Sequence, residues 1–363
     1  MVTTIIFFLV LTVLVFVHEM GHFLVARFFG IRVDDFAIGF PPRIWSFMYK
    51  KTRYAINLLP LGGYVRIHGE SPDDELTPDS ILAKPKWQQA LVLVAGVTFN
   101  IIFAWLILSL SLTFGTKTST DGFPVDTVRD RSVMIDFVSA ESPADTAGLK
   151  PGDELLAVSN KASSFSSSTL TISAVHNLIA TTPASSTISV TYKENLETKT
   201  VVVTPKEGIV AGKPAIGISM SEIGIVQLNP FSALYYGAIQ TYNLAIAIGT
   251  GLAKFIGSIF IGQANFKEIS GPVGIAVVLG QASRTGFSYL ITITAIISVN
   301  LAAINLVPFP ALDGGRLLVV GIEAIIRRPL KASVVNAINI VGFGFLIILM
   351  LVVTFKDILK LFN

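Results

Sequence analysis

The sequence "FVHEMGHFLVARFFG", residues 16–30, begins as an apolar membrane helix and is interrupted by three ionisable side chains. His18, Glu19 and His22 lie within five consecutive positions. Ionisable groups are costly inside a hydrocarbon layer, and those that occur there mark functional sites by default. The stretch therefore predicts a membrane-spanning helix that carries a reactive centre.

The segment "HEMGH" has the HExxH pattern of metalloproteases. Residues four apart on a helix lie on one face, so His18 and His22 can bind one metal ion. Two neutral imidazoles suit zinc, and Glu19 beside them can take a proton from the metal-bound water. The alternatives are a chance match and a pair of histidines that only pack in the helix interior.

The composition of the chain indicates a membrane protein with several spans. Of its 363 residues, 52% are hydrophobic and 14% are charged, whereas soluble globular proteins carry about 25% charged residues. No cluster of Lys and Arg interleaved with aromatic residues is present, so we expect no nucleic-acid partner. The chain has no cysteine, which excludes a disulfide framework and a thiol nucleophile.

Four apolar stretches are long enough to cross about 30 Å of hydrocarbon. They are residues 3–26, 89–114, 288–312 and 335–355. No basic residue precedes Arg27, so the first stretch is interpreted as a retained span and not as a cleaved signal peptide. Between the second and third stretches, residues rich in Ser, Thr, Val and Asp form short alternating runs, which predict a separate soluble domain.

Basic residues predict the orientation of these spans. Loops 27–88 and 313–334 are rich in Lys and Arg, and such loops stay in the cytoplasm. The N-terminus, the soluble domain and the C-terminus are then outside. A fifth apolar stretch, 231–259, is diluted by polar residues and glycines. If it spanned the membrane, loop 313–334 would lie outside, so we expect an amphipathic or half-inserted segment on the outer side.

A catalytic zinc needs a third protein ligand and an open position for water. In the four-span topology the third span ends at "NLVPFPALDGGR", on the same side as His18 and His22, so Asp313 is the predicted third ligand. The alternative is a polar residue in an Asp-Gly turn. Pro308 and Pro310 should break the helix just before Asp313, because proline removes a backbone donor.

Two asparagines, Asn300 and Asn305, lie on the same segment. An amide side chain there could hold the substrate backbone or the developing oxyanion. The alternative is interhelical hydrogen bonding, which asparagine also performs in membranes.

These motifs carry a family resemblance. "HEMGH" together with "NLVPFPALDGG" resembles the site-2 protease family of intramembrane zinc metalloproteases, in particular the bacterial regulator-of-sigma-E protease type. "YAINLLPLGGYVRIHGE", residues 54–70, is similar to the membrane-associated β-hairpin of that family, and "ISGPVGIA", residues 269–276, to its Ser-Gly-Pro block. "SPADTAGLKPGDELLAVSN", residues 142–160, resembles a PDZ domain.

The resemblance implies a polytopic α-helical membrane protein with four transmembrane helices, a membrane-associated β-hairpin and an inserted α+β PDZ domain. Carried over by position, it makes His18, His22 and Asp313 the zinc ligands and Glu19 the catalytic base. The candidate substrate-binding residues are Asn305, Asn300, Asn100, Gly62 and Gly63. The expected parts are a transmembrane core over 1–115, the PDZ domain over 122–206, an extracytoplasmic linker with an amphipathic segment over 207–287, and a second transmembrane core over 288–363.

The implied activity is zinc-dependent hydrolysis of peptide bonds within or near the transmembrane segments of single-span proteins. The implied setting is a bacterial cytoplasmic membrane, with the PDZ domain outside and the active site near the cytoplasmic side. The implied substrates are anti-sigma factors or signal-peptide remnants already cut by an upstream site-1-type protease. A non-enzymatic scaffold that presents a PDZ domain is the main alternative. A metal transporter is a second, but it would need several polar positions along a path, and one cluster is visible.

Overall fold

The computed structural model describes residues 2–70, 76–166, 169–194, 197–210, 213–263 and 271–362. Two compact units make up the chain. The first combines residues 1–111 with 230–363, and the second is residues 112–229. The first two residues of the Ser-Gly-Pro block, 269 and 270, lie outside the described residues.

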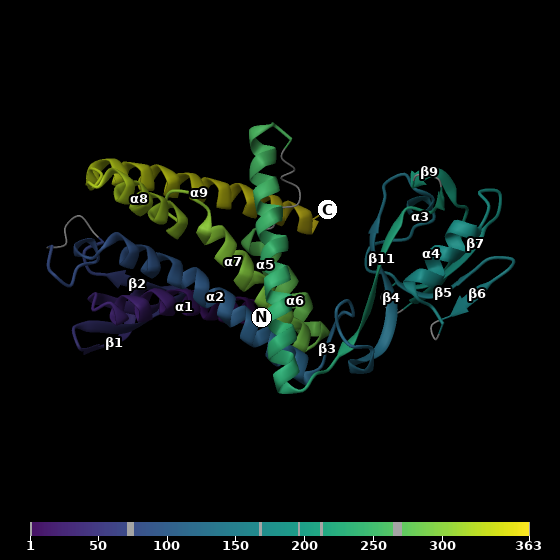
Figure 1. The fold of residues 1–363 in the computed structure, drawn as a ribbon, viewed down its shortest axis with the longest axis horizontal. Helices are drawn as coiled ribbons and strands as arrows, with labels where there is room; N and C mark the ends of the chain where they lie inside the picture. The colour runs from purple at the N-terminus through teal and green to yellow at the C-terminus, as the bar shows by residue number, and fades with distance from the viewer. Residues whose placement is uncertain are drawn as a thin grey trace. The chain divides into compact units, whose positions relative to one another are not determined.

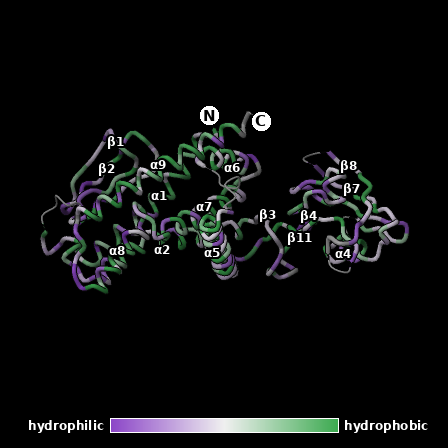
Figure 2. Tube along the Cα trace, turned by 90° about the horizontal axis from the view of Figure 1, so that it is seen from above, coloured by the Kyte–Doolittle hydropathy of each residue, from purple (hydrophilic) through white to green (hydrophobic). Residues whose placement is uncertain are grey.

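The first unit is built mainly of helices (Figure 1). They are α1 (Val2–Phe28), α2 (Lys86–Phe114), α5 (Pro230–Phe260), α6 (Pro272–Thr285), α7 (Phe287–Leu306), α8 (Asp313–Ile326) and α9 (Ala332–Phe362), with one 3-10 turn at Ile81–Ala83. Within the described chain, five helices are long and apolar enough to cross a membrane: α1, α2, α5, α7 and α9. Apolar residues run along these helices in Figure 2. The chain is therefore a multi-pass membrane protein.

Helix α5 corresponds to the fifth apolar stretch that the sequence left outside the four spans. Its mean hydropathy is 1.5, against 1.9 to 2.6 for the other four long helices. In Figure 1 α5 runs across the direction that α1, α2 and α9 roughly share, and in Figure 2, turned by 90°, α5 is seen nearly end-on. Length and composition alone do not separate four spans from five, so the four-span topology stays a prediction.

The third predicted span, residues 288–312, is broken before Asp313, as Pro308 and Pro310 predicted. Helix α7 ends at Leu306 instead of continuing to residue 312, and α8 begins at Asp313. The connecting turn is tight, since a side chain on Gly314 or Gly315 would lie within 2.4 Å of a carbonyl oxygen in residues 306–309. Asp313 therefore begins a new helix and does not end the old one.

Strands β1 (Val33–Tyr49) and β2 (Thr52–Ile67) form an antiparallel hairpin whose strands both bend. Asp35 is paired with Arg66 on one side and with Arg53 on the other, so the first half of β1 lies between both halves of β2. The pairing segments have the order 43–49, 52–57, 33–38, 63–67. Segment 63–67 is consequently an edge, with no further strand paired to it in the described chain.

Close backbone contacts position this edge and the helices. Thr12 on α1 donates to the Pro60 carbonyl at 3.0 Å. A side chain on Gly21 would lie 2.5 Å from the Ala95 carbonyl oxygen of α2. Small residues allow this close approach between membrane helices. Further along, the buried Asp357 of α9 accepts from the Gly271 and Gly274 amides at 2.8 Å, which ties the start of α6 to α9.

The second unit contains a mainly antiparallel sheet with strand order β3-β11-β4-β5-β7-β8, in which β6 pairs with β5. Its strands are β3 (Thr116–Ser119), β4 (Val128–Val138), β5 (Glu154–Ser159), β6 (Ser164–Ser166), β7 (Ile188–Glu194), β8 (Glu197–Val203) and β11 (Ile218–Val226). A separate small pair joins β9 (Lys206–Val210) and β10 (Lys213–Ala215). Helices α3 (Pro143–Thr146) and α4 (Ile172–Thr181) complete the unit, and α4 contributes Val175 and Leu178 to its core.

The boundaries of this unit differ from those expected from composition. Residues after 206 are not a linker up to the membrane, because β11 enters the sheet between β3 and β4. The unit begins before residue 122 as well, since β3 is the partner of β11. Long-range pairing decides both ends, and it leaves no mark in local composition.

Candidate metal centre

Helix α1 presents two imidazoles on one face. His18 and His22 are 6% and 5% exposed, and both belong to the buried side of the helix. Four residues advance a helix by little more than one turn, so the two side chains are neighbours along α1, with their rings nearly perpendicular to each other. Their centroids are 4.8 Å apart. At this separation both rings can bind one metal ion, as the sequence pattern predicted.

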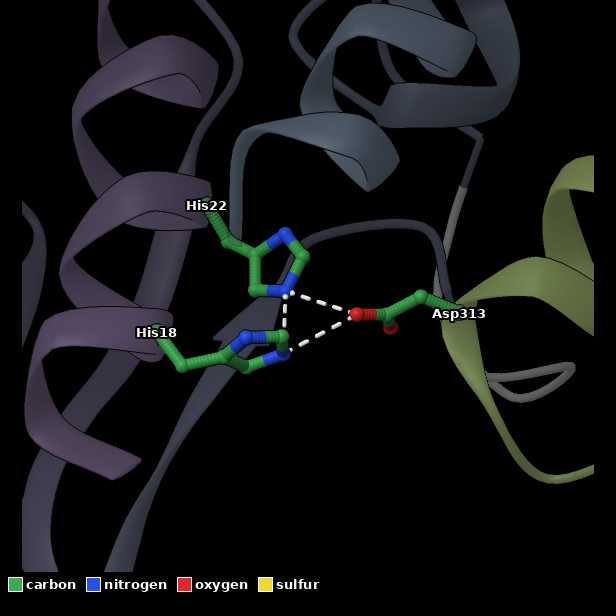
Figure 3. Close-up of side chains that lie close together, drawn as sticks. All are labelled: His18, His22 and Asp313. Atoms are coloured by element: carbon green, nitrogen blue, oxygen red, sulfur yellow. Dashed lines mark hydrogen bonds and ion pairs between the residues drawn. The ribbon is translucent and has the colours of Figure 1, made fainter. Parts of the chain in front are cut away.

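Asp313 comes from the opposite side of the cavity, at the first residue of α8 (Figure 3). Its Oδ2 lies 3.0 Å from His18 Nε2 and 3.2 Å from His22 Nε2, and the two Nε2 atoms are 3.2 Å apart. In the described part of the chain this is the one group of three potential ligands from His, Asp or Glu that converges in this way.

The spacing fits a zinc ion. Ligand atoms at about 2.0–2.1 Å from a tetrahedral zinc are about 3.3–3.4 Å from one another. The triangle of two imidazole nitrogens and one carboxylate oxygen is close to that size. Two nitrogens and one oxygen form a common donor set for catalytic zinc, with the fourth position left for water or substrate.

Hydrogen bonds behind the ligands select the required tautomers. The Nδ1–H of His22 donates a hydrogen bond to the Val92 carbonyl oxygen at 2.7 Å, and this tautomer leaves Nε2 with its lone pair for a metal. His18 Nδ1 lies 3.3 Å from the Asn100 amide nitrogen, while the buried Asn100 Oδ1 has no partner in the described chain. A half-turn of that amide exchanges its two atoms and lets Oδ1 accept from Nδ1–H. In that orientation Asn100 Oδ1 gains a partner, and His18 carries its proton on Nδ1, which leaves Nε2 free to bind the ion.

Gly96 of α2 lies directly against the ligands. A Cβ atom at this position would be 2.4 Å from His22 Nε2 and 2.7 Å from His18 Cε1. The backbone of α2 therefore lies against the rings beside the nitrogen atoms that face the candidate metal position, and a side chain at residue 96 would displace both rings. Sequence reasoning missed this residue, although a glycine in the middle of an otherwise apolar helix was a signal.

Glu19 lines the same cavity, of about 160 Å³, as the three ligands. Its Oε2 accepts a hydrogen bond from the Val65 backbone amide at 3.0 Å. Val65 belongs to the edge segment of β2, so the carboxylate is held between the helix and the strand edge. Glu19 is placed to accept a proton from water beside the metal position, and it is not one of the converging ligands.

The remaining predicted residues lie at different distances from this centre. The Asn305 amide nitrogen is 3.4 Å from His18 Nε2, the atom that faces the candidate metal position. Asn300 instead donates to the Ile296 carbonyl of its own helix. Asn100 is fully buried and contacts His18, which favours a positioning role over substrate contact. Gly62 and Gly63 are at the bend where β2 meets Val15 of α1 and Ala37 of β1.

Two charged residues in the cavity were not predicted. Glu70 follows β2, and Arg316 lies one turn after Asp313 on α8. Arg316 Nη1 donates to Glu70 Oε1 at 2.7 Å. Residues so far apart in sequence give no pairwise signal in a single chain, and only folding brings them together.

An HExxH pair on an apolar helix, a converging aspartate and a neighbouring glutamate form the arrangement expected of a membrane-embedded metalloprotease. Comparison with known proteins agrees. The model of Peptidase family M50 matches residues 6–349. The chain is 34% identical to a putative zinc metalloprotease of Clostridium perfringens, with 97% of each chain covered.

Two further relatives carry more specific names. The chain is 30% identical to zinc metalloprotease RasP of Geobacillus kaustophilus, over 98% of this chain and 97% of the relative. It is also 30% identical to the regulator of sigma-W protease RasP of Bacillus subtilis, over 99% of each. The chain belongs to peptidase family M50, the site-2 protease family, and is a zinc metalloprotease. The predicted family, enzyme class and zinc cofactor are confirmed.

Proposed function

We propose that this protein hydrolyses peptide bonds within or near the transmembrane segments of single-span membrane proteins. One observation carries the proposal: the catalytic base on an apolar helix is hydrogen-bonded to the edge of a β-strand, from Val65 N–H to Glu19 Oε2. A peptide bond inside a helix is shielded by its own hydrogen bonds. A strand edge beside the base offers an unwound substrate the main-chain partners that it has lost.

The chain's own residues can perform the remaining steps. Segment 63–67 binds the extended substrate through main-chain groups other than the Val65 N–H and the Ile67 carbonyl, which Glu19 and the Glu70 amide already engage. The chemistry that zinc supplies in such a site is polarisation of the scissile carbonyl and acidification of water. Glu19 accepts the proton from water and passes it to the leaving nitrogen. Asn305, beside His18 Nε2, is placed to donate to the substrate carbonyl oxygen as negative charge develops.

Basic residues near the candidate metal centre support the predicted orientation of the protein in the membrane. Arg27 at the end of α1 and the basic hairpin turn mark one membrane side, because Arg27 Nη1 contacts the Lys50 carbonyl at 3.5 Å. Such basic ends belong to the cytoplasmic face. His18 and His22 lie close to that end, so the proposed active site is near the cytoplasm. Helix α5, crossing the other long helices, is proposed to lie at the outer side without spanning.

The second unit is proposed to be an extracytoplasmic PDZ domain. In β11, residues 218–221 pair with β4 on one side. On the other side, backbone contacts begin at Glu222, whose carbonyl accepts from the Thr120 amide at 2.9 Å, and pairing with β3 begins at Ile223. The free edge borders a cavity of about 290 Å³ that α4 closes with His176 and Ile179. A groove between a strand edge and a helix is the arrangement by which PDZ domains bind extended peptides.

The proposed substrates are anti-sigma factors or signal-peptide remnants, cut beforehand by another protease outside the membrane. One relative is named for regulation of sigma-W, which supports the first class. The second unit would then select substrates by the length or sequence of the part that remains outside.

A comparison of Glu19→Gln with the wild type tests the proposal. The variant should retain about one zinc per chain, because Glu19 is not a ligand. It should also lose cleavage of a model single-span substrate. His18→Ala should lose both zinc and cleavage. Equal cleavage by wild type and Glu19→Gln would contradict the mechanism, and absence of cleavage by the zinc-loaded wild type would favour a scaffold.

A further inference from the structure

A second, larger cavity lies next to the metal centre, between α2, α8 and α9. Its volume is about 370 Å³, within the range of small-molecule and side-chain binding pockets. It shares three lining residues, Glu70, Leu93 and Arg316, with the cavity that holds His18, Glu19 and His22. The two cavities are therefore neighbours, with the Glu70–Arg316 ion pair in their common wall.

Most of the wall of the larger cavity is apolar. The apolar lining residues are Leu76, Ile81, Leu82, Leu93, Val319, Val320, Pro329, Leu330 and Val335. Its charged groups are paired with one another: Lys86 Nζ lies 2.7 Å from Glu323 Oε2, and Arg316 Nη1 lies 2.7 Å from Glu70 Oε1. An occupant therefore meets no net charge, and a large uncharged side chain fits this lining best.

The strand edge leads toward this cavity. Val65, which binds Glu19, and Ile67 both line the metal cavity, and the Glu70 amide donates to the Ile67 carbonyl at 3.3 Å. An extended peptide advances about 3.3 Å per residue along such an edge. A substrate paired with segment 63–67 would reach the Glu70–Arg316 pair roughly two to four residues from the point opposite Val65.

Two amides stand at the mouth of the cavity. Asn336 and Asn339 of α9 line both the apolar cavity and a wider opening of about 480 Å³ beside Glu70 and Arg316. Asparagine side chains provide both donors and acceptors. They can therefore bind the main chain of an extended peptide whose side chain enters the cavity. A lipid chain would gain nothing from these amides or from the rim charges.

We propose that the cavity between α2, α8 and α9 is a substrate subsite for a large apolar side chain a few residues from the scissile bond. The Glu70–Arg316 pair lies between this subsite and the metal cavity. Asn336 and Asn339 bind the neighbouring peptide backbone. This inference rests on the proposed function, because it assumes that the edge of β2 holds the substrate.

A cross-linking experiment tests the subsite without requiring cleavage. The chain has no cysteine, so Val320→Cys can be introduced into the Glu19→Gln protein without background. Single cysteines are then placed at successive positions around the cleavage site of a model substrate. A disulfide should form with one position only, or with two positions that are two residues apart, because side chains alternate along an extended peptide. The matched control is Ile325→Cys, on the same helix but 83% exposed, which should form none.

A specificity change in the active protein gives the second readout. Val320→Phe narrows the cavity, so at the cross-linked position it should shift the Leu-to-Ala ratio of kcat/KM about tenfold toward Ala. Ile325→Phe should leave the ratio unchanged. Leu330→Ala enlarges the cavity and should shift preference toward Phe, which covers the case that Val320→Phe folds poorly.

The possible failures are distinguishable. Cross-links at no position, or equal cross-links from Val320→Cys and Ile325→Cys, would overturn the subsite. An unchanged ratio in both Val320→Phe and Leu330→Ala would also overturn it and would leave a lipid as the occupant. Cleavage by the Glu19→Gln protein would instead overturn the proposed function, whatever the cross-links show.

Discussion

The Val65 backbone amide donates a hydrogen bond to Glu19 Oε2 at 3.0 Å, and this contact joins the edge of β2 to the HExxH helix. The strand edge and the catalytic base are therefore held as one assembly. The donor also fixes the direction of the carboxylate beside His18 and His22. In the proposed mechanism, substrate capture and proton transfer would therefore depend on the same short segment of backbone.

Replacing Val65 with Pro removes this donor, because proline has no backbone N–H. We expect Val65→Pro to lower kcat by about tenfold or more, since general base catalysis needs a positioned carboxylate. Zinc content should stay at the wild-type level. Val65→Ala keeps the amide and is the matched control. Equal kcat for the two variants would show that the contact does not position Glu19.

Asn100 should act through His18. Asn100→Ala removes the amide that can orient the imidazole, and loss of such partners typically weakens metal binding about 10–100-fold. Competition with a chelator measures the effect. Asn300→Ala is the control, because Asn300 donates to its own helix. If both variants lost zinc equally, general loosening of the helices would explain the result better than the contact with His18.

Gly96 tests the close packing behind the ligands. Gly96→Ala would place a methyl group 2.4 Å from His22 Nε2, so we expect loss of most bound zinc and of activity. Gly344→Ala, in the apolar helix α9, meets no atom within 4 Å and should retain both. Metal analysis of the purified variants distinguishes them. Full zinc occupancy in Gly96→Ala would mean that α2 can move away from α1 at little cost.

The position of α5 can be tested by cysteine labelling. If α5 does not span, Ser221→Cys before it and Ser283→Cys after it should both react with a membrane-impermeant thiol reagent from outside. Ser333→Cys, at the start of α9, should react only after the membrane is opened. Protection of Ser283→Cys, with Ser221→Cys labelled, would indicate five spans and would require a different placement of Asp313 relative to the membrane.

Local pattern was sufficient to predict part of this protein. The spacing of His18 and His22 fixes their shared face on α1, because the helical period is a local property. The prolines after Leu306 stop α7 for an equally local reason. The apolar lengths identified the long helices, and the motif identified the family and its zinc chemistry.

Tertiary structure decided the rest. The double bend that makes 63–67 an edge, the contact of Gly96 with both imidazoles and the Glu70–Arg316 pair all join residues distant in sequence. So does the entry of β11 into the sheet beyond residue 206. A single sequence shows the hydrophobic periodicity of each helix or strand and the residues, such as proline, that destabilise it. The charge rule and the need for a third ligand predicted that Asp313 meets His18 and His22. The other contacts between elements were not predicted, because packing depends on the shapes of surfaces that exist only after folding.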